Sequence, residues 1–117
     1  MRTVRIAHRF IQYGGRIFVP TIVVAELYGG AFKASDPSRL LAGIKTLLEE
    51  VAVLDFDSTC ARRFGEIRGA QLRTGQPSNV VDLMIASVAL THDLTMVTHN
   101  TADFVTIPAL RLDDWIQ

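Results

Sequence analysis

Three acidic residues that lie far apart in the sequence occupy positions where folding could bring them together. Asp82 lies near the start of the apolar stretch "NVVDLMIASVAL", Asp103 follows the apolar "LTMVT", and Glu26 follows the apolar "RIFVP". Carboxylates held close together repel one another unless a cation is bound or their pKa values rise. Mg²⁺ or Mn²⁺ prefers oxygen ligands and keeps several waters, so two or three carboxylates are enough to hold it. Such an ion activates water and neutralises phosphoryl charge, which is the chemistry of phosphodiester hydrolysis.

Each of these acids also has a purely structural explanation. An aspartate in the first turn of a helix, such as Asp82, is stabilised by the helix dipole. Asp103 could serve as a turn residue, and Glu26 could be an ordinary exposed glutamate on a helix. Spacing alone therefore leaves a shared metal site and three separate structural roles open.

Composition limits the protein to few classes. The 117 residues, of which 49% are apolar, predict a single domain over residues 1–117 with one buried core. The formal net charge is zero, so any polyanion would have to be held by a local patch. No apolar run has the length of a membrane span. The single cysteine, Cys60, predicts a buried thiol and a reducing, cytoplasmic compartment.

Helical and strand patterns alternate along the chain, which predicts an α/β fold with a mostly parallel sheet flanked by helices. We expect helices over residues 3–13, 22–32, 40–50, 60–74 and 80–92, and strands over 16–20, 51–56 and 94–98, with a last short strand within 109–115. Ligands of such sheets collect beyond the carboxyl ends of the strands. Glu26 and Asp103 follow two of these strands, so both are expected at that edge, and Asp82 joins them if its helix begins there.

Local signals predict how these helices begin and which faces they bury. The predicted N-caps are Thr21, either Asp36 or Ser38, and either Asp57 or Ser58. The residues expected to face inward in the helices over 40–50 and 60–74 are Leu40, Leu41, Ile44, Leu47, Leu48, Ala61, Phe64, Ile67 and Leu72.

Four stretches together resemble the PIN-domain ribonucleases of bacterial and archaeal toxin-antitoxin modules, the VapC toxins. They are "TIVVAELYGG", "VLDFD", "RTGQPSNVVDLMIASVALTHDLTMVTHNTADF" and "LRLDDW", and the similarity covers residues 16–115. The resemblance implies an endoribonuclease that uses Mg²⁺ or Mn²⁺ to cut structured RNA. It also implies a homodimer and a cognate antitoxin protein that inhibits the enzyme.

The resemblance also implies roles for individual residues. Glu26, Asp82 and Asp103 match acids of the family's catalytic and metal-binding set, and Thr98 and Asn100 fall where the family has polar residues that support the site.

One departure from the family pattern bears on activity. Members normally begin with a strand in the middle of the sheet that ends in an aspartate, a principal metal ligand, whereas the first acid of this chain is Glu26. We expect the chain to be a poor or inactive nuclease for this reason. The centre of the sheet could be completed by closure of the neighbouring strands, by rearranged N-terminal residues, or by strand exchange in a domain-swapped dimer.

Several functional alternatives remain open at the level of sequence. A non-catalytic protein that binds an antitoxin or a complete toxin is the main one, and a flavodoxin-like receiver domain is disfavoured because the acids do not come directly after the first strand. Tyr28 and Phe32 could belong to a partner groove or to the core. The arginines of residues 2–9 and 62–73 are interpreted as solvated faces, His99 as a loop residue, and Trp115 as an anchor of the C-terminus.

Overall fold

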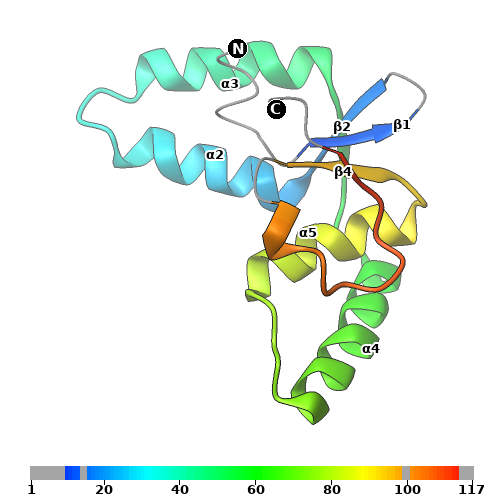
Figure 1. Cartoon of the computed structure of the whole chain (residues 1–117). Helices are drawn as coiled ribbons and strands as arrows, with labels where there is room; N and C mark the ends of the chain where they lie inside the picture. The colour runs from blue at the N-terminus through cyan, green and yellow to red at the C-terminus, as the bar shows by residue number, and fades with distance from the viewer. Residues whose placement is uncertain (1–9, 14–15, 99–100, 114–117) are drawn as a thin grey trace.

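A five-stranded mixed sheet forms the centre of the molecule (Figure 1). The computed structural model describes residues 10–13, 16–98 and 101–113. The order across the sheet is β3-β2-β1-β4-β5. The strands are β1 (Phe10–Tyr13), β2 (Arg16–Pro20), β3 (Ala52–Leu54), β4 (Thr95–Val97) and β5 (Leu112–Asp113). The pairs β2–β3 and β4–β5 are parallel, which together with the helices confirms the predicted α/β class.

The described residues form four α-helices, which flank the sheet in two groups (Figure 1). Helices α2 (Thr21–Lys33) and α3 (Ser38–Glu50) lie side by side and form an arm that projects from the body. Helix α5 (Val80–Thr91) packs against β4, α2 and α4 (Ser58–Thr74). A single 3-10 turn, η1 (Thr101–Asp103), follows β4. None of the helices in the described ranges is both long and apolar enough to cross a bilayer.

The predicted helix over residues 3–13 is wrong for the part that is described. Residues 10–13 form β1, which pairs antiparallel with β2 on one side and with β4 on the other, whereas residues 3–9 lie outside the described residues. Two glycines separate β1 from β2 in the sequence, a strong signal for a hairpin. Ladder hydrogen bonds on both sides of β1 outweigh the helical periodicity of this short segment. Three ways to complete the centre of the sheet were open at the level of sequence. The structure shows the second of them, in which N-terminal residues rearrange and form the central strand.

The direction of β1 fixes the direction of its neighbours. Because β2 and β4 each run antiparallel to β1, they run parallel to one another. Their carboxyl ends therefore meet at one edge, hereafter the rim, where α2 begins directly after β2 and the segment leading to η1 follows β4. The predicted gathering of Glu26 and Asp103 at one edge depends on this shared direction.

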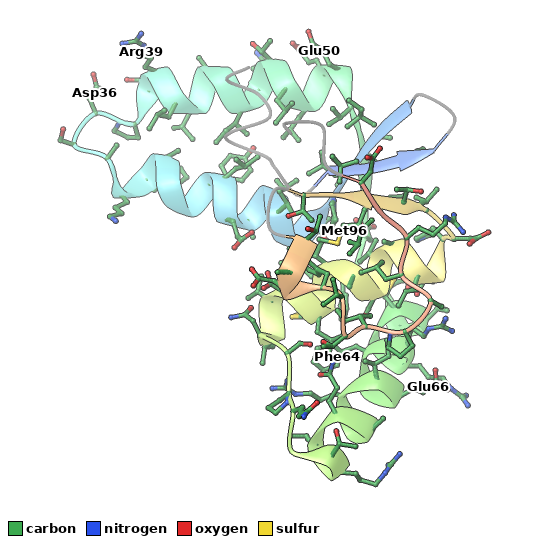
Figure 2. All side chains as sticks on the ribbon, viewed as in Figure 1. Asp36, Arg39, Glu50, Phe64, Glu66 and Met96 are labelled. Carbon is green, nitrogen blue, oxygen red and sulfur yellow. The ribbon has the colours of Figure 1, made fainter. Side chains whose placement is uncertain are left out.

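The core is built around α5 and β4. Six residues of α5 are buried, and β4 contributes Met96 and Val97; in Figure 2, Met96 lies between the sheet and α5. Helix α5 is apolar on almost every side, as expected for a helix enclosed by neighbouring elements. Its one buried hydroxyl, Ser87 Oγ, donates to the carbonyl of Leu83 at 2.6 Å, so it adds no unsatisfied group.

The predicted helix caps are confirmed in one of three places. Asp57 caps α4 and accepts from the Cys60 N–H at 3.0 Å. Thr21 is instead the first residue of α2, after Pro20, and its hydroxyl accepts from the Phe56 N–H at 3.3 Å, which ties α2 to the segment after β3. The residue before α3 is Pro37, so neither Asp36 nor Ser38 is its N-cap.

The inward face of α4 is rotated from the predicted one. Ala61 and Leu72 are exposed, whereas Cys60 and Gln71 are buried. Phe64, which Figure 2 places between α4 and α5, and Ile67 pack against the core as predicted. In α3, Ile44 is buried but Leu40 is 45% exposed. The true face of α4 follows the spacing 60, 64, 67, 71, which sequence analysis missed because the last member is polar.

The buried Cys60 thiol confirms the prediction of a structural cysteine. It is 0% exposed, and burial raises its pKa above the usual value of a thiol. Both effects keep it protonated and unreactive near neutral pH.

The Asp57 cap should make stability depend on pH in a defined direction. The hydrogen bond from the Cys60 backbone N–H lowers the pKa of Asp57 below its usual value of 3.8. The ionised Asp57 side chain therefore stabilises the fold above pH 3.8, and this stabilisation is lost as the pH falls through the lower pKa of the folded state. We expect Asp57→Ala to lower the melting temperature at neutral pH, and the difference from the parent to shrink towards about pH 3. Asp57→Asn, which retains a cap, is the control. A difference that is independent of pH would contradict this account.

Candidate active site

A polar cleft of about 500 Å³ opens at the rim and contains two of the three predicted acids. Its described lining comes from two segments that lie far apart in the sequence. The first is the α4–α5 connection with the first turn of α5, and the second is η1 with the loop after it. The lining residues are Gln76, Pro77, Ser78, Asn79, Asp82, Asp103 and Thr106.

Asp82 is held in place by the start of α5. Asn79 is the N-cap, and its side-chain oxygen accepts from the backbone N–H of Asp82 at 3.0 Å. The next residue, Leu83, is 0% exposed, and its N–H donates to the Asn79 carbonyl at 3.0 Å. Burial of Leu83 and the cap of Asn79 thus fix the first turn on both sides, and Asp82 lies half-buried between them at the cleft.

Asp103 is positioned by the loop after β4, in which residues that line the cleft are each followed by a buried residue. Phe104 and Ile107 are 1% and 3% exposed and anchor this loop in the core. Backbone hydrogen bonds from Phe104 to Thr101 and from Ile107 to Phe104, at 3.0 and 3.1 Å, form two successive tight turns. The residues immediately before these anchors, Asp103 and Thr106, line the cleft.

Glu26 is the one predicted acid that the described lining of the cleft does not include. It is exposed on α2, beyond the carboxyl end of β2. Within the described part of the chain, no three His, Cys, Asp or Glu side chains form a group able to hold a metal ion. The structure therefore brings together Asp82 and Asp103, and the role predicted for Glu26 stays a prediction.

The two predicted supporting residues differ in what the structure reveals. Thr98 directly follows β4, is 1% exposed, and donates its N–H to the Asp113 carbonyl at 3.0 Å, so it fixes the point at which the chain leaves the sheet. Asn100 lies outside the described residues.

Sequence analysis missed the side chains that hold the α4–α5 connection. Gln71, only 8% exposed, and Arg68 reach from α4 to Ser78 in the cleft lining. The signal that could have revealed them is the helical spacing of Gln71 from Phe64 and Ile67, which places a polar side chain on the buried face of α4.

The chemistry of the cleft suits a hard divalent cation. Two carboxylates face a space that is otherwise lined by hydroxyl, amide and proline groups, and the described lining contains no lysine or arginine. Mg²⁺ and Mn²⁺ need only one or two carboxylates when waters and substrate oxygens complete the coordination. The donor set thus fits such an ion, with Asp82 and Asp103 as the residues that would hold it.

Comparisons with known proteins reveal relatives of this chain in sequence and in structure. The family model of the PIN domain matches residues 2–110. The chain is 36% identical over 110 residues to the tRNA(fMet)-specific endonuclease VapC of Shigella flexneri, covering 94% of this chain and 83% of that protein. It is 35% identical over 115 residues to ribonuclease VapC2 of Haemophilus influenzae, covering 98% and 87%. The crystal structure of DNA-bound VapBC from Salmonella typhimurium superposes with a TM-score of 0.80 at 37% identity, covering 84% of this chain and 74% of that one.

The cap at Asn79 can be tested directly. We expect Asn79→Ala to lower the free energy of unfolding by about 1 kcal/mol, because the Asp82 N–H loses its partner. Asn79→Ser, which can still cap the helix, should retain most of the stability. Urea unfolding of the parent and the two variants measures the loss of free energy of unfolding in each variant. Equal losses for the alanine and serine variants would show that the cap does not hold this turn.

Proposed function

The chain belongs to the PIN-domain family, and from this membership we propose that it is a VapC-like ribonuclease toxin that hydrolyses RNA phosphodiester bonds with a divalent cation. The observation that carries the proposal is the shared cleft of Asp82 and Asp103 at the rim. Two relatives with more than a third of their aligned residues identical are named as RNA-cutting enzymes, which supports the same reaction class.

In this proposal Asp82 and Asp103 hold Mg²⁺ or Mn²⁺. A bound ion of this kind lowers the pKa of water and neutralises charge that develops on the phosphoryl oxygens. The chain's own contribution is to hold two carboxylates at fixed positions, one on a helix that is buried behind it and one on a loop anchored by Phe104. Thr98 supports the end of β4, and Asn100 is proposed to contribute a polar group to the same site.

Glu26 enters the proposal as a third acid of the rim. It occupies an exposed position on α2, which packs against α5. Residues 1–25 contain no Asp or Glu, so Glu26 is the earliest residue in the sequence that could add a carboxylate. With few carboxylates the ion has looser geometry, and a displacement of about 1 Å costs on the order of a hundredfold in rate. We therefore expect slow turnover.

The small number of carboxylates at the cleft also favours a second candidate function. A PIN-like protein that binds an antitoxin or a complete toxin without cutting RNA would need the fold but not a full metal site. The observation that favours it is the lack of any three-residue acidic or histidine cluster within the described ranges.

The proposed protein partner is a cognate antitoxin. One similar solved structure is DNA-bound VapBC from Salmonella typhimurium, which supports a partner of this kind. Tyr28 and Phe32 stack with ring centroids 6.4 Å apart on α2 and are 39% and 64% exposed, so the alternative that they belong to the core does not hold. We propose that this pair belongs to the surface that binds the antitoxin. A homodimer is also part of the proposal. A cytoplasmic location, which suits the protonated Cys60 thiol, is also part of it.

The function can be tested with purified protein and structured RNA. We expect slow cleavage that requires Mg²⁺ or Mn²⁺ and stops with EDTA, and we expect Asp82→Asn and Asp103→Asn each to reduce it on the order of a hundredfold. Glu26→Gln should cause a smaller loss. Glu66→Gln is the matched control, because Glu66 points outward from α4 (Figure 2).

The outcomes separate the two candidate functions. Cleavage that survives both asparagine substitutions would refute the proposed site. If the parent protein cuts nothing but forms a stable complex with an antitoxin, the binding-protein alternative is correct.

A further inference from the structure

Ser78, in the lining of the cleft, has all three of its polar groups engaged by side chains of α4. Gln71 Oε1 accepts from the Ser78 N–H at 2.9 Å, and Gln71 Nε2 donates to Ser78 Oγ at 2.7 Å. One helical turn earlier, Arg68 Nη1 donates to the Ser78 carbonyl at 2.7 Å. A single loop residue is thus held in position and orientation by two helical side chains.

We propose that Gln71 and Arg68 are positioning residues that set where Asp82 stands in the cleft, and thereby how tightly the cleft binds a divalent cation. The inference rests on the proposed function for the identity of the ligand. Neither residue lines the cleft, so both act through Ser78.

The path from these side chains to the carboxylate is short and continuous. Ser78 is followed by Asn79, whose side chain caps the Asp82 N–H at 3.0 Å. Any shift of Ser78 therefore moves the cap, and with it the first turn of α5. Ligands of metal ions are commonly oriented by such outer hydrogen bonds, and removal of one typically costs 10- to 100-fold in metal affinity.

Other features leave this loop dependent on the two side chains. Gln76, Pro77 and Asn79 are exposed, so burial does not hold them. The loop begins at Gly75, whose left-handed backbone (φ 73°) ends α4, and Gln76 N–H donates to the Gln71 carbonyl at 3.0 Å. Gln71 thus contacts the loop with both its main chain and its side chain. The oxygen and the nitrogen of its buried amide both have hydrogen-bond partners, which avoids the free-energy penalty of an unpaired buried polar atom.

A purely structural role for Gln71 is the competing explanation. In that case, replacing it would lower global stability without a specific effect on the cleft. Gln71→Met is the informative variant because it retains the length and packing of the side chain and removes both hydrogen bonds. Arg68→Met is the second variant, which removes only the bond to the Ser78 carbonyl.

Two measurements on the purified full-length chain test the proposal. The first is Mn²⁺ affinity, from the electron paramagnetic resonance signal of free Mn²⁺ during titration. We expect Gln71→Met to weaken binding roughly tenfold and Arg68→Met to weaken it by a smaller factor. The second is amide hydrogen exchange of Ser78 and Asp82 without metal, followed by NMR. We expect exchange at Ser78 to become roughly tenfold faster in Gln71→Met.

Two controls make the result specific. Ile44→Ala removes a buried apolar side chain of α3, away from the cleft lining. It should lower the melting temperature while leaving Mn²⁺ affinity and exchange at Ser78 unchanged. Asp82→Asn should weaken Mn²⁺ binding directly, which checks that the ion binds in the cleft.

The controls separate failure of this inference from failure of the proposed function. If Asp82→Asn weakens Mn²⁺ binding but Gln71→Met does not, Gln71 is only structural and the inference is overturned. If the parent binds no Mn²⁺, or Asp82→Asn binds it as the parent does, the proposed function fails. Exchange at Asp82 then decides the positioning role, because the Ser78 N–H loses its acceptor in Gln71→Met in either case. Faster exchange at Asp82 supports the role, and unchanged exchange at Asp82 overturns it.

Discussion

The burial of α5 is the constraint on which the site depends. Leu83, Ile85 and Val88 are each 0% exposed, and a fully buried side chain of this size contributes about 1.5–3 kcal/mol relative to an exposed one. Sliding or rotating the helix would sacrifice several such contributions at once, so its axis is fixed by the core. Asp82, in the first turn, cannot turn away from the rim without moving Leu83 beside it. The acid is positioned by the apolar residues that follow it.

The central strand of the sheet, β1, completes the backbone pairing of its two neighbours. The resemblance assigns that position to a strand ending in an aspartate, and here β1 occupies it, running antiparallel to both neighbours. Its residues, FIQY, contain no carboxylate. Because β1 runs the opposite way, an acid at its carboxyl end would face the edge away from the rim. β1 therefore satisfies the backbone groups of β2 and β4 and contributes no carboxylate to the rim.

Sequence reasoning succeeded where one physical signal dominated and failed where two competed. The strand at 16–20, α5 and the Asp57 cap follow from apolar runs and a single strong capping residue, and they are confirmed. The segment at 10–13 has helical spacing but sits beside a Gly-Gly hairpin signal, and pairing with two strands determined the result. Gln71 was missed because a polar residue on a buried face becomes visible only with its partner, Ser78. The sequence predicts that Glu26, Asp82 and Asp103 converge, and the described lining of the cleft contains the two aspartates. The position of these aspartates depends on Phe104 and on the start of α5, which no spacing rule specifies.

The central claim is that Asp82 and Asp103 together hold one divalent cation in this cleft. A crystal of the protein grown or soaked with Mn²⁺ tests it most directly through anomalous scattering. The account predicts one anomalous peak in the cleft, with a carboxylate oxygen of each residue at about 2.0–2.4 Å, near the distances typical of hard divalent ions. A well-ordered cleft without a peak at saturating Mn²⁺, or a peak bound to other residues, would contradict it.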